Sequence, residues 1–153
     1  MSLVARHKRA GGFRKLVNSI ETTPPDKRAK ILEAMRKEDP DFISEVENSV
    51  FSFEDFLKIS DLIIGDIIDA LKTEPKTWAL ALYHSDVTLV EKFTKNMRPD
   101  EYHPYKEALE MLPSVLAREQ LAARFRIISK ARELESRHKF VLKKYSPVFD
   151  TSV

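Results

Sequence analysis

Residues 60–71 read Ser-Asp-Leu-Ile-Ile-Gly-Asp-Ile-Ile-Asp-Ala-Leu, and this stretch decides the fold class. Ser60 or Asp61 can cap a helix, because either side chain can accept a hydrogen bond from an amide of the first turn. Apolar side chains then cover nearly every side of the helix, so we expect it to lie at the centre of a core. Gly65 interrupts it at a cost of about 1 kcal/mol relative to alanine. A close helix crossing would explain this glycine.

Downstream of residue 71, apolar residues continue to recur at helical spacing. Prolines and capping residues divide this region, because the residue before a proline is disfavoured in a helix. We therefore expect helices that begin at Pro75, at Asp86, near Pro104 and near Leu116, the last of them running to Phe140.

Upstream, the sequence predicts three short helices within residues 13–50. The first carries apolar residues at i, i+3, i+4 and i+7 from Phe13. Thr23 is a predicted cap of the second, and Asp39-Pro40 ends the second and caps the third. Three short helices joined by proline turns are typical of one armadillo-like repeat, which needs a neighbour in cis or in trans to bury its apolar surface. Gly11-Gly12 before the first helix is either a hinge or a plain loop.

The aromatic stretch at residues 51–57 is the predicted junction between two subdomains. We expect an all-α chain in which an armadillo-like three-helix repeat is followed by a C-terminal bundle of about six helices. The expected boundaries are a flexible N-terminus at 1–10, the repeat at 11–52, the bundle at 53–142 and a frayed tail at 143–153.

Composition excludes several classes of protein. The chain has 153 residues, with 26 lysines and arginines, 24 aspartates and glutamates, and no cysteine. Disulfide and thiolate metal sites are therefore ruled out, and the composition fits a reducing compartment. The sequence has no apolar run long enough to cross a membrane, and the segment at residues 1–9 has charges where a signal peptide needs apolar residues, so we predict a cytoplasmic protein.

The residues needed for catalysis do not occur together. The sequence has no glycine-rich phosphate loop, no His-Glu-x-x-His motif and no serine nucleophile elbow. Its histidines, at positions 7, 84, 103 and 138, lack metal-ligand spacing and are interpreted as surface residues. We therefore predict a non-enzymatic binding module with no cofactor, no metal and no small-molecule substrate.

Four motifs follow one another along the chain: Gly11-Gly12-Phe13, Val50–Asp55, Ala79–Leu82 and Glu91–Met97. Their order is similar to that in the family of the flagellar motor switch protein FliG. The region from Gly11-Gly12-Phe13 to Glu38-Asp39-Pro40-Asp41 resembles the family's link between middle and C-terminal domains. Val50-Phe51-Ser52-Phe53-Glu54-Asp55 is similar to its Met-Phe-x-Phe-Glu-Asp junction. Ala79-Leu80-Ala81-Leu82 and the later Glu91–Met97 segment resemble its Leu-Ala-Leu-Lys-Gly segment and its Glu-Lys-x-x-x-Asn-Met signature. The resemblance extends over residues 11–140.

This resemblance implies a protein of the flagellar rotor, at the cytoplasmic face of the inner membrane. The family's repeat unit binds a switch-ring protein and neighbouring rotor subunits, and its C-terminal unit meets the cytoplasmic loop of the stator through charged residues on one helix. The resemblance also implies that the junction lets the two units turn against each other, which reverses rotation. The candidate torque-face residues are Asp100, Lys106, Glu107 and Glu110. The candidate partner or hinge residues are Gly11, Gly12, Phe51, Phe53, Glu54 and Asp55.

The sequence departs from the family at its charged positions. Tyr83-His84 stands where the family has Lys-Gly, Asp100 where it has a basic residue, Ala108 where it has a second acid, and Leu116 where it has an arginine. Glu107 alone keeps the family's charge. The sequence has no counterpart of the family's N-terminal and middle domains, so it is either a piece of a longer chain or a short divergent paralogue.

Two alternative functions stay open. The first is a paralogue that acts as a scaffold without torque, because the charged positions differ. The second is a nucleic-acid or membrane-surface binder that uses two basic clusters, Arg6–Arg9 and Arg137–Lys139 with Lys143 and Lys144. For these clusters, a solvated surface next to a chain or helix terminus is the competing interpretation.

Overall fold

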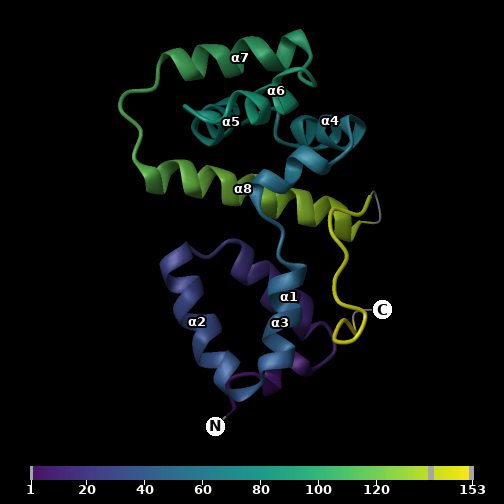
Figure 1. Ribbon diagram of the computed structural model, residues 1–153. Coiled ribbons are helices and arrows are strands. Elements are labelled where there is room, and N and C mark those ends of the chain that lie inside the picture. The colour runs from purple at the N-terminus through teal and green to yellow at the C-terminus, as the bar shows by residue number, and fades with distance from the viewer. Residues whose placement is uncertain (1, 138–139, 152–153) are drawn as a thin grey trace. The chain divides into compact units, whose positions relative to one another are not determined.

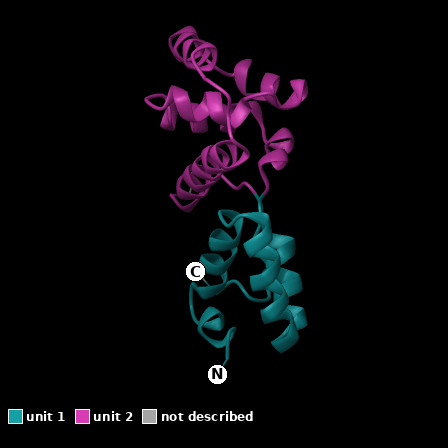
Figure 2. Ribbon diagram, turned by 90° about the vertical axis from the view of Figure 1, so that its left-hand side faces the viewer, with its two compact units in different colours: residues 1–51, 143–153 teal, residues 52–142 magenta. Residues whose placement is uncertain are grey.

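The computed structural model describes residues 2–137 and 140–151, and in these ranges the regular elements are helices with no strand (Figure 1). The chain forms two compact units (Figure 2). Unit 1 contains residues up to Phe51 and the C-terminal residues from Lys143, and unit 2 contains Ser52–Leu142. The division lies one residue before the boundary expected from the sequence.

Unit 1 is a three-helix unit with a short 3₁₀ turn before it. Its elements are η1 (Ala5–Lys8), α1 (Gly12–Glu21), α2 (Pro25–Glu38) and α3 (Pro40–Ser49). Helix α3 packs against both α1 and α2. The core consists of apolar residues spaced by three or four along each helix, as a helical period of 3.6 requires. Its buried members include Phe13, Leu16, Val17, Ile20, Leu32, Met35, Phe42, Ile43 and Val46.

The helix caps of unit 1 agree with the sequence at one position and differ at another. The Asp39 side chain accepts a hydrogen bond from the amide of Phe42 at 3.2 Å, which confirms it as the cap of α3. Thr23 does not cap α2. Its hydroxyl donates to the carbonyl of Ser19 at 2.6 Å, and Pro24 takes the cap position without a side-chain hydrogen bond.

The chain before α1 is packed, where the sequence suggested a flexible or frayed segment. Val4 is 1% exposed, and its amide donates to Glu38 at 2.8 Å. Gly11 adopts a left-handed backbone with φ of 78°, which glycine tolerates better than other residues. A β-carbon on Gly12 would lie 2.6 Å from the carbonyl oxygen of His7. Close packing of η1 on α1 therefore accounts for glycine at both positions.

The C-terminal residues are also packed, which corrects the expectation of a frayed tail. We call residues 143–151 the C-terminal segment. Phe149 packs against the core of unit 1, and Ser146 is buried. The segment lacks the helical periodicity by which burial is recognised in a sequence, so its packing gave no signal there.

Unit 2 begins with η2 (Phe53–Lys58) and continues with α4 (Asp61–Ala70), α5 (Pro75–Leu82), α6 (Val87–Thr94), α7 (Pro99–Glu110) and α8 (Ala117–Ser136). Helix α5 packs against α7 and α8, while α4 packs against α6 and α8. The predicted caps of α4 and α6 are confirmed. Ser60 accepts a hydrogen bond from the amide of Ile63 at 3.4 Å, and Asp86 accepts one from Thr88 at 2.9 Å.

Helix α4 is buried on one face, not on nearly every side. Ile64, Ile67 and Ile68 are almost fully buried, while Leu62 is 80% exposed. No non-neighbouring atom of the described residues lies within 4 Å of a β-carbon built on Gly65. The expected close helix crossing at this glycine is therefore wrong, since the position opens onto free space.

Replacing Gly65 with alanine is expected to raise the free energy of unfolding by about 0.5–1 kcal/mol, because alanine favours the helix and its methyl group fits. Urea unfolding followed by circular dichroism measures the change. Gly12→Ala is the matched control, and its methyl group would clash with the backbone at His7, so it should lower stability. A Gly65→Ala protein less stable than wild type would contradict the expectation.

Helix α7 differs from the short helix expected to begin near Pro104. It begins five residues earlier at Pro99, and Pro104 lies inside it. Proline suits the first helical position, and the Glu101 carboxylate accepts a hydrogen bond from the amide of Arg98 at 2.9 Å, which caps the start. Helix α8 ends at Ser136, so the expected extension to Phe140 is also wrong.

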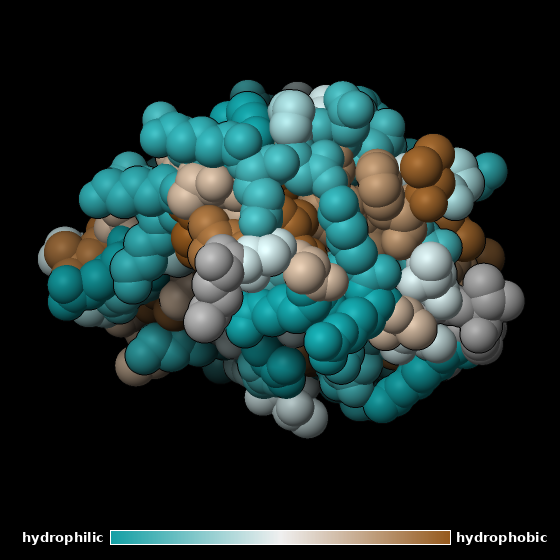
Figure 3. Space-filling view, turned by 90° about the horizontal axis from the view of Figure 1, so that it is seen from below, coloured by the Kyte–Doolittle hydropathy of each residue, from teal (hydrophilic) through white to brown (hydrophobic). Residues whose placement is uncertain are grey.

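The exposed apolar residues are scattered. On the face of the molecule in Figure 3, hydrophobic residues form small patches separated by hydrophilic ones. Large apolar side chains with high exposure include Met111, Val148 and Val87. No described helix is both long enough and apolar enough to cross a bilayer.

Candidate functional site

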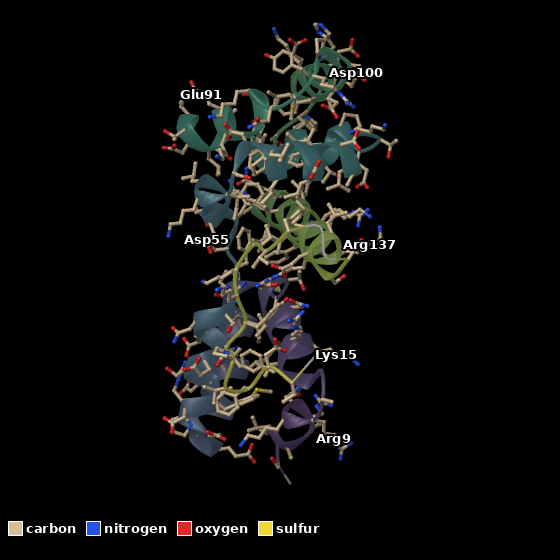
Figure 4. All side chains as sticks on the ribbon, turned by 90° about the vertical axis from the view of Figure 1, so that its right-hand side faces the viewer. Arg9, Lys15, Asp55, Glu91, Asp100 and Arg137 are labelled. Atoms are coloured by element: carbon tan, nitrogen blue, oxygen red, sulfur yellow. The ribbon has the colours of Figure 1, made fainter. Side chains whose placement is uncertain are left out.

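Helix α7 presents a charged ridge to solvent. Asp100, His103, Glu107 and Glu110 follow one another at intervals of three or four residues and are all exposed, and exposed Lys106 lies at the edge of the same face. We call these five residues the α7 ridge. Asp100, at the first turn, is labelled in Figure 4. The four candidate torque-face residues therefore share one solvent-facing side of one helix.

The opposite face of α7 anchors the ridge to unit 2. Tyr105 is 4% exposed, and its pKa is raised above the ordinary value by burial and by neighbouring Tyr102. Arg98, just before the helix, contacts Asp69 of α4 at 3.1 Å and Glu101 at 3.4 Å. These contacts fix the rotation of α7 about its own axis, and so fix which side chains reach solvent.

Most charges of the ridge are uncompensated. Lys106, Glu107 and Glu110 form no ion pair with any residue that the structure describes, and Asp100 lies 3.6 Å from Arg98. With three carboxylates and one ammonium group, the ridge is net acidic. Exposed charges of this kind act over about 10 Å at ordinary ionic strength and steer an encounter more than they stabilise a complex.

The junction residues divide between the two units. Phe51 is 1% exposed in unit 1, where its amide donates to buried Glu21 at 2.7 Å. Phe53 is 4% exposed in unit 2, where its ring stacks on Phe93 at 5.5 Å. Ser52 alone separates these anchors. Neither phenylalanine forms an apolar patch on the surface.

The acidic residues of the junction stabilise the start of unit 2. The Asp55 carboxylate accepts a hydrogen bond from the amide of Ser52 at 2.9 Å, and the two residues form a capping box. Glu54 is exposed and lies 3.6 Å from Arg124. The aromatic and acidic residues of the Phe-x-Phe-Glu-Asp motif thus have structural partners, and Asp55 is labelled in Figure 4.

The Glu91–Met97 segment also has a structural role. Lys92 and Asn96 lie one turn apart at the end of α6 and donate to Asp61 of α4 at 2.9 and 3.2 Å. The hydrogen bond from Lys92, with that from Asn96, lowers the pKa of Asp61 below its ordinary value. The contact is exposed, so it orients α6 on α4 more than it stabilises the unit.

The turn after α5 contains a residue with a left-handed backbone conformation. His84 has a φ of 47°, the one positive value at a non-glycine residue in the described chain. Its ring stacks on Tyr83 at 4.1 Å. This left-handed position favours glycine, so His84 adopts it at a conformational cost.

The two basic clusters are partly neutralised within the protein. Lys8 pairs with Asp39, Arg137 with Glu133 at 2.8 Å, and Lys143 donates to the carbonyl of Val50 at 2.8 Å. His138 and Lys139 lie outside the described residues. Because these cations have partners within the protein, the contacts favour a structural role for the basic clusters over binding to nucleic acid or to a membrane surface.

Sequence reasoning missed two features. One is the C-terminal segment, and the other is the pair formed by Arg132 and Glu135, whose side chains are 4% and 8% exposed and 2.8 Å apart. The i,i+3 spacing was visible in the sequence, but this spacing is common on exposed helix faces.

Among the described residues, no group of histidines and carboxylates is arranged to hold a metal ion.

Comparison with known proteins gives consistent matches. A family model described as FliG C-terminal domain matches residues 33–142. The flagellar motor switch protein FliG of Borreliella burgdorferi is 27% identical over 133 residues, which make up 87% of this chain and 38% of that protein. The corresponding protein of Thermotoga maritima is 29% identical over 127 residues, or 83% of this chain and 36% of the relative.

A solved structure shows a similar fold. Full-length FliG from Aquifex aeolicus matches with a TM-score of 0.56 and 24% sequence identity, over 87% of this chain and 41% of that one. The chain thus spans well under half the length of each of these relatives. The family match contains all of unit 2 and ends directly before the C-terminal segment.

Proposed function

Because the chain belongs to the FliG C-terminal domain family, we propose that it is a non-enzymatic component of the flagellar rotor and switch ring. In this proposal it works at the cytoplasmic face of the inner membrane, at the base of the flagellum. Its partners are a switch-ring protein and neighbouring rotor subunits. It takes part in motility and in the change of rotational direction that chemotaxis requires.

The α7 ridge supports a contact with the cytoplasmic loop of a stator. Its exposed carboxylates lie on one rigid helix, and a repeated transient contact needs charges that steer the partner without holding it. Since the ridge is net acidic, the complementary surface would be basic. Glu107 is the residue of this ridge at which the charge agrees with the family.

A scaffold without torque is the second candidate function. It is supported by the uncharged residues at positions where the family carries charge, which include Ala108 on α7 and half-exposed Leu116 before α8. A scaffold would keep the ring contacts and lose the stator contact. The two candidates therefore differ in whether the α7 ridge is needed.

Deletion of the gene, followed by tracking of tethered cells, tests the proposal. We expect filaments that do not turn, or that turn without reversing. Unchanged rotation would reject the rotor function. The Glu107→Lys/Glu110→Lys variant then separates the two candidates, with the exposed Asp66→Lys of α4 as the matched control. Slower rotation in the ridge variant alone indicates a stator contact, while normal rotation in both variants indicates the scaffold.

A further inference from the structure

The C-terminal segment, which is part of unit 1, packs on the face that α1 and α3 form within that unit. The ring of Phe149 meets the edge of Phe42 at 4.9 Å and stacks on Phe13 at 6.1 Å. Phe13 and Phe42 also contact each other at 5.7 Å. The segment therefore inserts one aromatic side chain against a pair that is already packed within the unit.

Polar contacts fix the segment on both sides of this aromatic anchor. Arg14 of α1 donates through Nε and Nη2 to the carboxylate of Asp150 at 2.9–3.1 Å, a bidentate geometry. The same guanidinium lies 4.4 Å from the ring centre of Tyr145, whose hydroxyl donates to Asn18 at 2.9 Å. Tyr145 and Asp150 thus share the Arg14 guanidinium, while Phe149 packs on the aromatic pair of α1 and α3.

The segment is attached mainly through its side chains. Its main chain also contacts α3, where the amide of Ser146 donates to the hydroxyl of Ser49 at 3.1 Å. Tyr145 and Phe149 are only partly buried, and Val148 between them is 71% exposed. By contrast, the helices of unit 1 pack on one another through fully buried core residues, such as Ile43 and Val46. These features are typical of a bound peptide more than of a core element.

We propose that the α1–α3 face of unit 1 is a recognition surface for aromatic–acidic peptides that form a turn, and that the C-terminal segment, which has a turn at residues 147–149, occupies it in cis as a releasable ligand. A single armadillo-like repeat needs a neighbour to cover its apolar surface, and the segment supplies this cover. Because it is tethered, the segment acts at an effective concentration of roughly mM. A competing protein can use this face only after displacing it.

The surface and its ligand can be tested without reference to the flagellum. The probe is a fluorescent peptide of residues 143–153, titrated into the full chain and followed by anisotropy. Wild-type protein should bind it weakly, because the cis segment competes. A full-chain Phe149→Ala/Asp150→Asn variant, whose own segment is weakened, should bind it at least ten-fold more tightly. Val148→Ala is the matched control and should behave as wild type, since Val148 is exposed.

Two further changes define the contact. Adding Arg14→Gln to the opened variant should abolish binding, and so should a peptide with alanine at position 149 and asparagine at position 150. An opened variant that is folded by circular dichroism and does not bind the peptide would overturn the proposal.

Hydrogen exchange on the wild-type chain gives a second test, which holds even if the opened variant unfolds. The amides of Ser146 and Asp150, which are hydrogen-bonded at 3.1 and 2.9 Å, should exchange faster than those of α1 and α3, because release precedes unfolding of the unit. Equal exchange rates would mean that the segment leaves only on global unfolding, and the proposal would be wrong.

Discussion

Replacing Phe53 with alanine is expected to lower the free energy of unfolding of unit 2 by about 3–5 kcal/mol. The Phe53 ring contacts several members of an aromatic cluster. It stacks on Phe93, meets Phe56 edge-on at 5.3 Å and carries the guanidinium of Arg124 at 4.7 Å from its centre. Removing the ring loses buried area and these oriented contacts, and leaves a cavity in a densely packed core.

Trp78 is a built-in probe for this experiment, because it is the single tryptophan of the chain and lies 5.3 Å from Phe93. Its fluorescence during urea unfolding reports on unit 2. The control is Leu57→Ala in the same short helix, where the side chain is 40% exposed and the loss should stay below about 1 kcal/mol. Equal losses in the two variants would contradict the role of Phe53 as a core anchor.

Removal of Arg132 is expected to have an effect of similar size, about 3–5 kcal/mol for Arg132→Met. The guanidinium is buried beside the Glu135 carboxylate, and this carboxylate also accepts a hydrogen bond from the amide of Leu142 at 2.6 Å. Without Arg132, a buried negative charge stays without its cation. Denaturant unfolding at neutral pH measures the loss.

The surface pair of Arg137 and Glu133 is the matched control. Its nitrogen and oxygen atoms are also 2.8 Å apart, but the side chains are 60% and 41% exposed, so Arg137→Met should cost below about 1 kcal/mol. The double variant Arg132→Met/Glu135→Gln should regain part of the stability lost in Arg132→Met, because it removes the isolated charge. If Arg132→Met costs no more than Arg137→Met, burial does not strengthen this pair.

The sequence predicted the all-α class and much of unit 2, because these depend on local signals. Caps at Asp39, Ser60 and Asp86 are recognisable from the residue and its neighbours. Pro104 was misread as a helix start because proline usually marks a boundary, while here the cap at Arg98 and Glu101 begins the helix five residues earlier.

The two parts of the candidate site, the α7 ridge and the junction, differ in how much of their structure could be predicted from the sequence. The candidate torque-face residues of the α7 ridge were named from the family resemblance, and the helix expected to begin near Pro104 did not include Asp100. For the junction, the sequence showed two phenylalanines without indicating that they enter different cores. The contact between Arg14 and Asp150 joins residues 136 positions apart, and such a distant pairing has no local signature in one sequence.

The return of the C-terminal segment to unit 1 also affects synthesis on the ribosome. Unit 2 is in effect an insertion between two parts of unit 1. At roughly 5–20 residues per second, the 91 residues of unit 2, from Ser52 to Leu142, take about 5–20 s to translate. During that interval Phe13 and Phe42 of the nascent chain have no Phe149 to cover them. Other proteins, including chaperones, therefore have access to this face before the chain's own segment has been made.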